Sequence, residues 1–207
     1  MTIEFYNFLA NAVLAGSALA ASIAAIRGLN TWQREKTWES DQALARKMAV
    51  ALQRRQDSFR WLRNSIVSSG EMNLAVRNDP DAANEDEVVD HDEAWALAMN
   101  ARLQKLTEAV LEYYGCQIEA EVVWGEEVGS LSRELGDLEF QVQLALDDIA
   151  RKRSMERDVP NSQELSDFEI RNRKLAFGRK DDETDAEHTE KIDAIRSILK
   201  TKLGRKP

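Results

Sequence analysis

The two histidines, with the carboxylates beside them, are the residues of this chain best suited to bind a metal ion. Asp185 and His188 stand three positions apart, which places both side chains on one face of a helix, and Glu187 and Glu190 are close by. A di-metal site in a helical bundle needs this unit twice, together with further inward carboxylates. The other histidine, His91, lies among acidic residues and gives no second copy of the unit. The sequence therefore predicts no metal site and a hydrogen-bonded or semi-exposed His188.

Other catalytic or cofactor-binding chemistry has no support in the sequence. Cys116 is the single cysteine, which excludes an internal disulfide framework, and we expect it to be a small, semi-buried residue. Gly125 and Gly129 lie within a helical pattern and lack the Lys-Ser or Lys-Thr pair that follows a phosphate-binding loop. Neither a serine elbow between glycines nor a dinucleotide fingerprint is present. We therefore expect no enzyme and no cofactor, and we identify no small-molecule substrate.

Charge is unevenly distributed along the 207 residues, whose formal net charge is −9 at pH 7. Residues 70–93 hold nine acidic residues and one basic residue, whereas residues 27–63 hold nine basic and four acidic residues. The dense carboxylates, with an Asp-Pro pair at 79–80, predict a solvated acidic loop over 70–92. Their spacing does not match a calcium-binding loop, and whether the loop binds a cation stays open. Nucleic-acid binding is not expected, because the remaining chain is acidic or mixed.

An uncharged stretch of 22 residues, 5–26, lies between Glu4 and Arg27. As a helix it is about 33 Å long, enough for a hydrocarbon core of about 30 Å. Lysine and arginine are absent before the stretch and abundant after it, so the positive-inside rule places the N-terminus outside and the remaining chain in the cytoplasm. We therefore expect a transmembrane anchor over 1–28 and a juxtamembrane stalk helix over 29–69.

Two other interpretations of the apolar stretch are open. A cleavable signal peptide needs a small-x-small site, which residues 18–20 supply, but also a basic segment in front, which is missing. A buried helix of a soluble domain needs other helices to surround it. For the anchor, we expect contact with anionic lipid headgroups from the basic residues that follow it. These residues are Arg27, Arg34 and Lys36.

Small residues recur at every fourth position of the apolar stretch, at Ala12, Gly16, Ala20 and Ala24. This spacing aligns them on one helix face, where two backbones can approach closely and gain van der Waals contact in lipid. An alanine-rich composition by itself also produces such a pattern. We predict that this face supports self-association or contact with another membrane protein.

Residues 124–149 carry the strongest helical signal outside the anchor. Their apolar positions follow alternating steps of four and three residues, which is the period of a coiled coil. The positions of this seam are Trp124, Val128, Leu131, Leu135, Leu138, Val142, Ala145 and Ile149. Burying the seam joins subunits or packs the bundle of one chain, and the sequence leaves both open.

The expected fold class is therefore all-α. The N-terminal transmembrane helix continues into a cytoplasmic helical bundle with coiled-coil-like packing. That bundle spans 93–207 and is completed by the stalk. Two capping boxes are expected to start its last two helices, Asn161 with Glu164 and Thr184 with Glu187.

The stretch TWQREKTWESDQALARKMAVALQRRQDSFRWLRNSIVSSGE, residues 31–71, resembles a group of uncharacterised bacterial proteins. In that group a membrane helix precedes a stalk rich in Trp, Arg and Gln, which ends in an Arg-Asn pair like Arg63-Asn64. Proline tends to follow that pair in the group, whereas Ser65 stands here. The later stretches LAFGRKDDETD and KIDAIRSIL are similar to the closing helices of the group. The resemblance implies a single-pass helical protein of a bacterial inner membrane and implies no activity.

Together these features predict a membrane-anchored helical interaction or scaffold protein. It would be a homo-oligomer or a subunit of a membrane complex. The alternative is a membrane-disrupting or channel-forming effector of a bacterial stress or phage-defence system, in which the small-residue helix assembles in the membrane.

Overall fold

The computed structural model describes residues 3–80, 89–155, 166–178 and 182–204, with side chains from residue 16 onward except those of residues 20, 154 and 155. Within these ranges every regular element is an α-helix, which confirms the expected all-α class. The helices are α1 (Ile3–Leu62), α2 (Ser69–Asn78), α3 (His91–Trp124), α4 (Glu127–Met155), α5 (Asp167–Ala176) and α6 (Glu183–Gly204).

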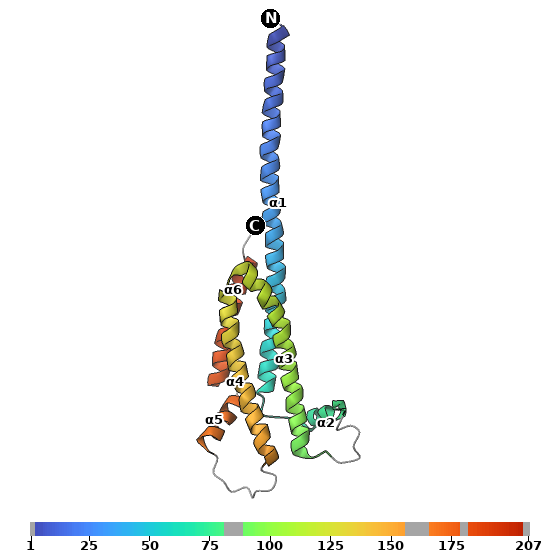
Figure 1. The fold of residues 1–207 in the computed structure, drawn as a ribbon, viewed down its shortest axis with the longest axis vertical. Coiled ribbons are helices and arrows are strands. Elements are labelled where there is room, and N and C mark those ends of the chain that lie inside the picture. The colour runs from blue at the N-terminus through green and yellow to red at the C-terminus, as the bar shows by residue number, and fades with distance from the viewer. Residues whose placement is uncertain (1–2, 81–88, 156–165, 179–181, 205–207) are drawn as a thin grey trace.

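Four of the helices form an antiparallel bundle (Figure 1). The lower part of α1 packs against α3 and α6, and α4 packs against the same two helices, so the four occupy the corners of a square. Of the two short helices, α2 packs on α3 and α5 packs on α4. The expected helical bundle is therefore confirmed, and it is built within one chain.

Heptad spacing explains why these helices pack as they do. The buried positions of each helix follow steps of three and four residues, which keep one stripe turned toward its neighbours. On α3 these positions are Trp95, Met99, Arg102, Leu106, Ala109, Tyr113, Cys116 and Ala120. On α1 they are Ala45, Met48, Leu52, Arg55, Phe59 and Leu62, and on α6 they are Asp185, His188, Ile192, Ile195 and Leu199.

The seam predicted over 124–149 is divided between two helices, and the expectation of one continuous helix is wrong. Trp124 is the last residue of α3, and Gly125 follows with φ 93°, a conformation that glycine adopts without steric cost. The chain then reverses into α4, whose seam members pack inside this chain. Those buried are Val128, Leu135, Leu138, Val142 and Ala145, with Leu131 and Ile149 partly buried.

The acidic loop expected over 70–92 is wrong at both of its ends. Its first residues belong to α2, where the Ser68 hydroxyl accepts a hydrogen bond from the Glu71 backbone N–H at 3.2 Å and caps the helix. Its last residues belong to α3, which is capped by Asp90. A good N-cap and a buried methionine, Met72, outweigh the acidic composition. Residues 81–88 lie outside the described part of the chain.

Of the two predicted capping boxes, only the one at Thr184 can be compared with the structure. Asn161 and Glu164 lie outside the described residues. α5 begins with a capping box at Ser166 and Glu169, in which each side chain accepts a hydrogen bond from the other residue's backbone N–H. At α6 the Asp182 carboxylate, rather than Thr184, accepts a hydrogen bond from the Asp185 backbone N–H at 2.8 Å.

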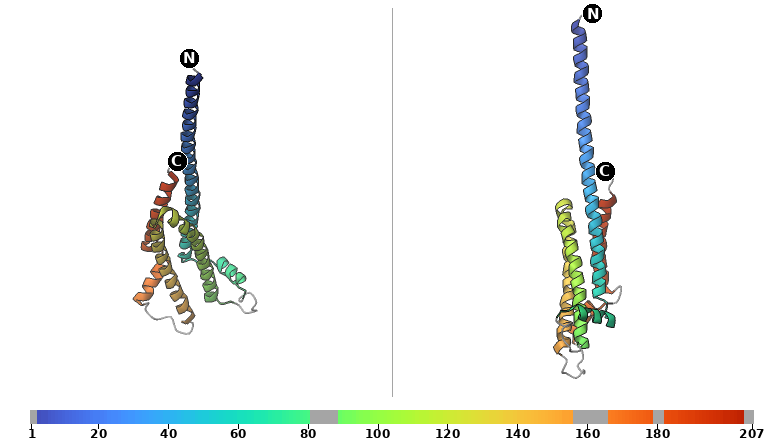
Figure 2. Two further views of the ribbon diagram at one scale, coloured as in Figure 1. Left: turned by 45° about the horizontal axis from the view of Figure 1, so that its top comes forward. Right: turned by 90° about the vertical axis from the view of Figure 1, so that its right-hand side faces the viewer.

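α1 is one helix of 60 residues, and its upper part extends far beyond the bundle (Figures 1 and 2). The packed part of α1 begins near Asp41 and Gln42. Asp41 accepts a hydrogen bond from Trp124 Nε1 of α3 at 3.1 Å, and Gln42 donates one to the Leu203 carbonyl of α6 at 3.0 Å. In the part of the chain whose side chains are described, no helix is long and apolar enough to cross a membrane.

Candidate functional site

A layer of polar side chains crosses the middle of the four-helix core. Arg55 of α1, Tyr113 of α3, Glu139 of α4 and His188 of α6 supply one side chain from each long helix, and the exposed fraction of each is 5% or less. The layer separates two apolar clusters. The cluster on its upper side, toward the projecting helix, includes Leu52, Leu135 and Ile192, and the cluster on the other side includes Phe59, Leu106 and Val142.

The Glu139 carboxylate is the centre of this layer. Arg55 donates from Nε to both carboxylate oxygens, at 2.9 and 3.1 Å, and from Nη2 to Oε2 at 2.9 Å. His188 Nε2 lies 3.2 Å from Oε1, and the imidazole ring stacks on Phe59 with a centroid separation of 3.8 Å. The Arg55 guanidinium also lies over the Tyr113 ring, 5.1 Å from its centroid. The layer is therefore a bidentate ion pair extended by an imidazole and two aromatic rings.

Burial determines the protonation states around this ion pair. Loss of solvation lowers the pKa of His188, although the neighbouring Glu139 carboxylate opposes this effect. The neutral ring donates from Nε2 to Glu139, which leaves Nδ1 unprotonated and without a hydrogen-bond partner among the described atoms. Burial also raises the pKa of Tyr113 to about 12, and its hydroxyl is hydrogen-bonded to Ser132 at 2.7 Å. Both rings are thus uncharged at neutral pH.

Acid should destabilise the bundle through His188. Because the pKa of His188 is lowered in the fold, the unfolded chain, with an ordinary value of about 6.5, binds a proton that the folded chain does not. Stability therefore falls as pH falls below about 6.5, by up to about 1.4 kcal/mol per pH unit. The groups facing the ring are Glu139 on α4, Arg55 on α1 and Asp185 on its own helix.

Urea denaturation between about pH 7 and pH 5 measures this effect, and His188→Phe is the matched variant. The variant should have a nearly constant free energy of unfolding over this interval, whereas the unchanged chain should lose stability toward its lower end. Carboxylates with lowered pKa, such as Glu71 and Asp182, begin to be protonated only below their ordinary values of 4.5 and 3.8. Equal slopes for the two proteins would contradict the assignment.

This layer is not arranged as a catalytic or metal site. Its carboxylate is saturated by Arg55, and the described residues contain no group of three or more metal-ligating side chains. Cys116 is buried and its pKa is raised by burial, so its thiol is protonated and a poor nucleophile. A polar layer in a heptad core can instead fix which helix positions lie side by side, since a shifted register leaves a charge unpaired.

Two further buried arginines tie the short helices to the bundle. Arg102 donates to the Glu71 carboxylate of α2 from Nε at 2.6 Å and from Nη2 at 2.8 Å, and to the Ile66 carbonyl at 2.8 Å. Arg63 donates to Asp182 at 2.9 and 2.8 Å and to backbone carbonyls at the end of α5. Sequence reasoning missed Arg102 and Glu139 as core residues. An arginine at a heptad position of α3 was the available signal.

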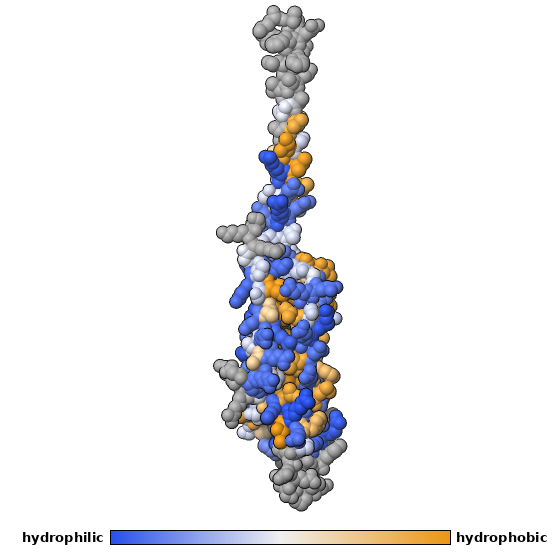
Figure 3. Space-filling view, turned by 90° about the vertical axis from the view of Figure 1, so that its left-hand side faces the viewer, coloured by the Kyte–Doolittle hydropathy of each residue, from blue (hydrophilic) through white to orange (hydrophobic). Residues whose placement is uncertain are grey.

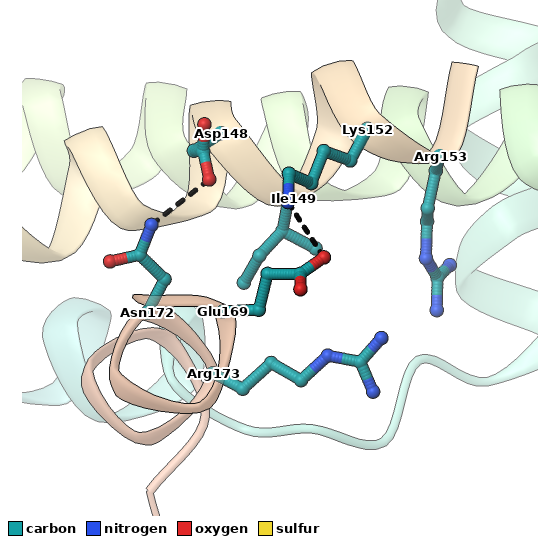
Figure 4. A pocket seen from close by; sticks show the side chains of 7 residues that line it. All are labelled: Asp148, Ile149, Lys152, Arg153, Glu169, Asn172 and Arg173. Carbon is teal, nitrogen blue, oxygen red and sulfur yellow. Dashed lines mark hydrogen bonds and ion pairs between the residues drawn. The ribbon is translucent and has the colours of Figure 1, made fainter. Parts of the chain in front are cut away.

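A small cavity between α4 and α5 is lined by charged and polar side chains (Figure 4). Lys152 Nζ lies 2.6 Å from Glu169 Oε1, and Asn172 donates to Asp148 at 3.0 Å. Lys152 and Ser166 lower the pKa of Glu169 to about 2. These two contacts attach α5 to α4.

The projecting part of α1 is the other distinctive feature. Residues 16–19 and 21–37 are exposed, including its large apolar side chains, whose exposed fractions run from 44% at Ile23 to 65% at Leu19. In the space-filling view, apolar surface appears on this projecting helix as well as along the body of the bundle (Figure 3). The exposed apolar residues of the projection are Leu19, Ile23, Ile26, Leu29 and Trp32.

The structure also places the other residues singled out on this segment. Gly16 and Ala24 are exposed, while the side chains of Ala12 and Ala20 lie outside the description. Arg27, Arg34 and Lys36 are exposed. Lys36 Nζ forms an ion pair with Glu39 Oε2 at 2.7 Å. All of these residues lie on the projecting part of α1, above the four-helix bundle.

Comparison with models of known protein families, with curated proteins and with solved structures found no match to this chain. Its function must therefore be inferred from its own geometry. Two features are available for that inference, the enclosed polar layer and the unpartnered apolar helix. The first lies inside the bundle, whereas the apolar side chains of the second are not covered by any other helix in the described part of the chain.

Proposed function

We propose that this protein is a membrane-anchored helical scaffold. Residues 1–28 hold the four-helix bundle on the cytoplasmic side of a bacterial inner membrane, where the bundle presents helical faces to partner proteins. The observation that carries the proposal is the exposure of Leu19, Ile23 and Ile26 on the projecting part of α1, which none of the other described helices covers. Burying such side chains contributes about 1.5–3 kcal/mol each, and a lipid bilayer supplies that burial for a sequence of 22 uncharged residues.

The change of character along α1 supports this arrangement. The stripe of α1 that faces the core continues upward through Asp41 and Trp38, which are partly buried, and then through polar residues at Arg34, Thr31 and Arg27 before it reaches apolar residues again. A helix meant to pack against more of its own chain would keep this stripe apolar. The polar interval instead suits an aqueous spacer between bundle and bilayer, with Arg27 and Arg34 near the anionic headgroups.

Alkaline extraction of membranes tests the anchor. The full chain should stay in the membrane pellet, and removal of residues 1–28 should release a folded bundle into the soluble fraction. Leu14→Lys with Leu19→Lys should shift the full chain toward the soluble fraction, because both positions lie in the middle part of the uncharged stretch 5–26, and each lysine near the bilayer centre costs about 2.5–3.5 kcal/mol. The matched control is Phe140→Lys with Leu144→Lys, which changes two exposed apolar residues of α4.

Full release of the unchanged chain by alkaline extraction would overturn the proposal. Expression should also leave the membrane potential intact, because a scaffold needs no pore. If expression of the unchanged chain dissipates the membrane potential and expression of the Gly16→Leu variant does not, the channel-forming alternative is indicated instead.

A further inference from the structure

α3 carries a second apolar stripe on the side that faces away from the core. Leu111, Ile118 and Val122 are exposed, with 83% of Val122 accessible, and they flank Gly115. The steps between these four positions are four, three and four residues, the spacing of a helix-packing seam. At 3.6 residues per turn the stripe lies opposite core residues such as Ala120. α3 thus has a packing seam on each side, and the described helices of this chain cover only one of them.

Gly115 gives a second and independent sign of a missing partner. A glycine inside a helix destabilises it by about 0.5–1 kcal/mol relative to alanine. Within the described chain nothing requires glycine there, because a Cβ at position 115 would meet no atom within 4 Å, and a positive φ occurs only at Gly125. At Gly129, by contrast, a Cβ would collide with the Glu121 side chain. A helix approaching from outside gives Gly115 a role, since glycine lets two backbones come close.

We propose that this outer stripe is a homodimer interface, in which α3 of one copy pairs in parallel with α3 of a second copy. The stripe matches itself in register, with glycine against glycine and Ile118 against Ile118. Tyr114 of α3, which is 53% exposed, lies at its border and widens the apolar contact. The proposed pairing is argued from the apolar stripe of α3 and does not depend on the membrane anchor. Its parallel direction also agrees with the proposed anchor, because copies inserted in one membrane point the same way.

The charges beside the stripe favour the parallel direction as well. Glu112 is bonded to Arg54 of α1 at 2.7 Å, which identifies the α1 side of the stripe, and Glu108 and Glu119 lie on that same side. The α4 side carries Arg133, which is 65% exposed and only 3.8 Å from Glu121. A parallel two-fold pair brings the α1 side of one copy against the α4 side of the other, so Arg133, which is level with Glu121, faces the side that carries Glu119 together with Lys47 of α1. An antiparallel pair brings like sides together.

Light scattering on the full chain, purified in detergent at micromolar concentration, measures the assembly. The unchanged chain should have the mass of a dimer, and Leu111→Glu with Ile118→Glu should halve it without changing helicity. Phe140→Glu with Leu144→Glu alters two exposed apolar residues of α4 and should leave the dimer intact. A monomeric unchanged chain, or a double variant that stays dimeric, would overturn the interface.

Oxidative crosslinking of Val122→Cys tests the direction. In the parallel pair the two thiols face each other and form a reducible dimer, whereas an antiparallel pair sets position 122 against position 111. The native Cys116 is 1% exposed, so the unchanged chain should stay uncrosslinked. Membrane extraction of the same samples separates the two proposals. If the protein is crosslinked but released from the membrane, the dimer interface is supported and the membrane anchor is contradicted. If it is retained in the membrane but not crosslinked, the anchor is supported and the interface is contradicted.

Discussion

Glu139→Ala is expected to lower the free energy of unfolding by about 3–5 kcal/mol. The substitution leaves the Arg55 guanidinium 2% exposed with no counter-ion from Glu139, and it also removes the acceptor of His188 Nε2. A buried charge without its partner is among the most destabilising changes in a core. Urea denaturation followed by circular dichroism measures the loss.

Glu134→Ala is the matched control on the same helix. Its carboxylate pairs with Lys191 at 3.0 Å, but the Glu134 side chain is 53% exposed, so its loss should cost less than about 1 kcal/mol. Replacing Arg55, Glu139 and His188 together by Met, Leu and Phe should restore much of the stability, because an apolar layer of similar volume carries no desolvation penalty. Equal losses for Glu139→Ala and Glu134→Ala would contradict the buried ion pair.

Leu135→Asp is expected to abolish the folded bundle. Leu135 is fully buried in the upper apolar cluster with Leu52 and Ile192, so the substitution removes a buried leucine, at about 2–5 kcal/mol, and adds the cost of a charge in an apolar site. The sum approaches the whole stability of a typical domain, about 5–15 kcal/mol. Loss of the cooperative unfolding transition is the readout.

Leu144→Asp, at an exposed position of the same helix, should change stability by less than about 0.5 kcal/mol. The comparison also decides how the predicted seam is used. If the seam joined subunits, the Leu135→Asp variant would stay folded but form a smaller assembly. A folded monomeric Leu135→Asp variant would therefore contradict its packing inside one chain.

Heptad spacing explains why the all-α class and most buried positions of α4 were predictable. The phase of the seam runs from Trp124 to Val128 without a jump, and both residues pack into the same apolar cluster. The pattern therefore could not reveal the reversal at Gly125, because a tight turn between two antiparallel helices preserved the buried face. A two-residue turn at 125–126, in which Gly125 has a positive φ that a hydropathy pattern does not show, separates α3 from α4.

The polar layer could not be predicted for a different reason. Hydropathy assigns arginine and glutamate to the surface, and Arg55 and Glu139 are 84 residues apart in the sequence. Each is favourable inside only because the other is there, so neither position alone carries the signal. The same holds for Arg102 with Glu71, whose pairing attaches a helix that composition assigned to an acidic loop.

The spacer within α1 has an electrostatic consequence. Asp41, where the bundle begins, is 14 residues beyond Arg27, which corresponds to about 21 Å of helix. Electrostatic interactions in physiological salt decay over about 8 Å, so this distance exceeds two screening lengths. With the anchor in a bilayer, an acidic body carried on this rigid arm is hardly repelled by anionic headgroups. The helix thus allows a negatively charged bundle to work beside a negatively charged surface.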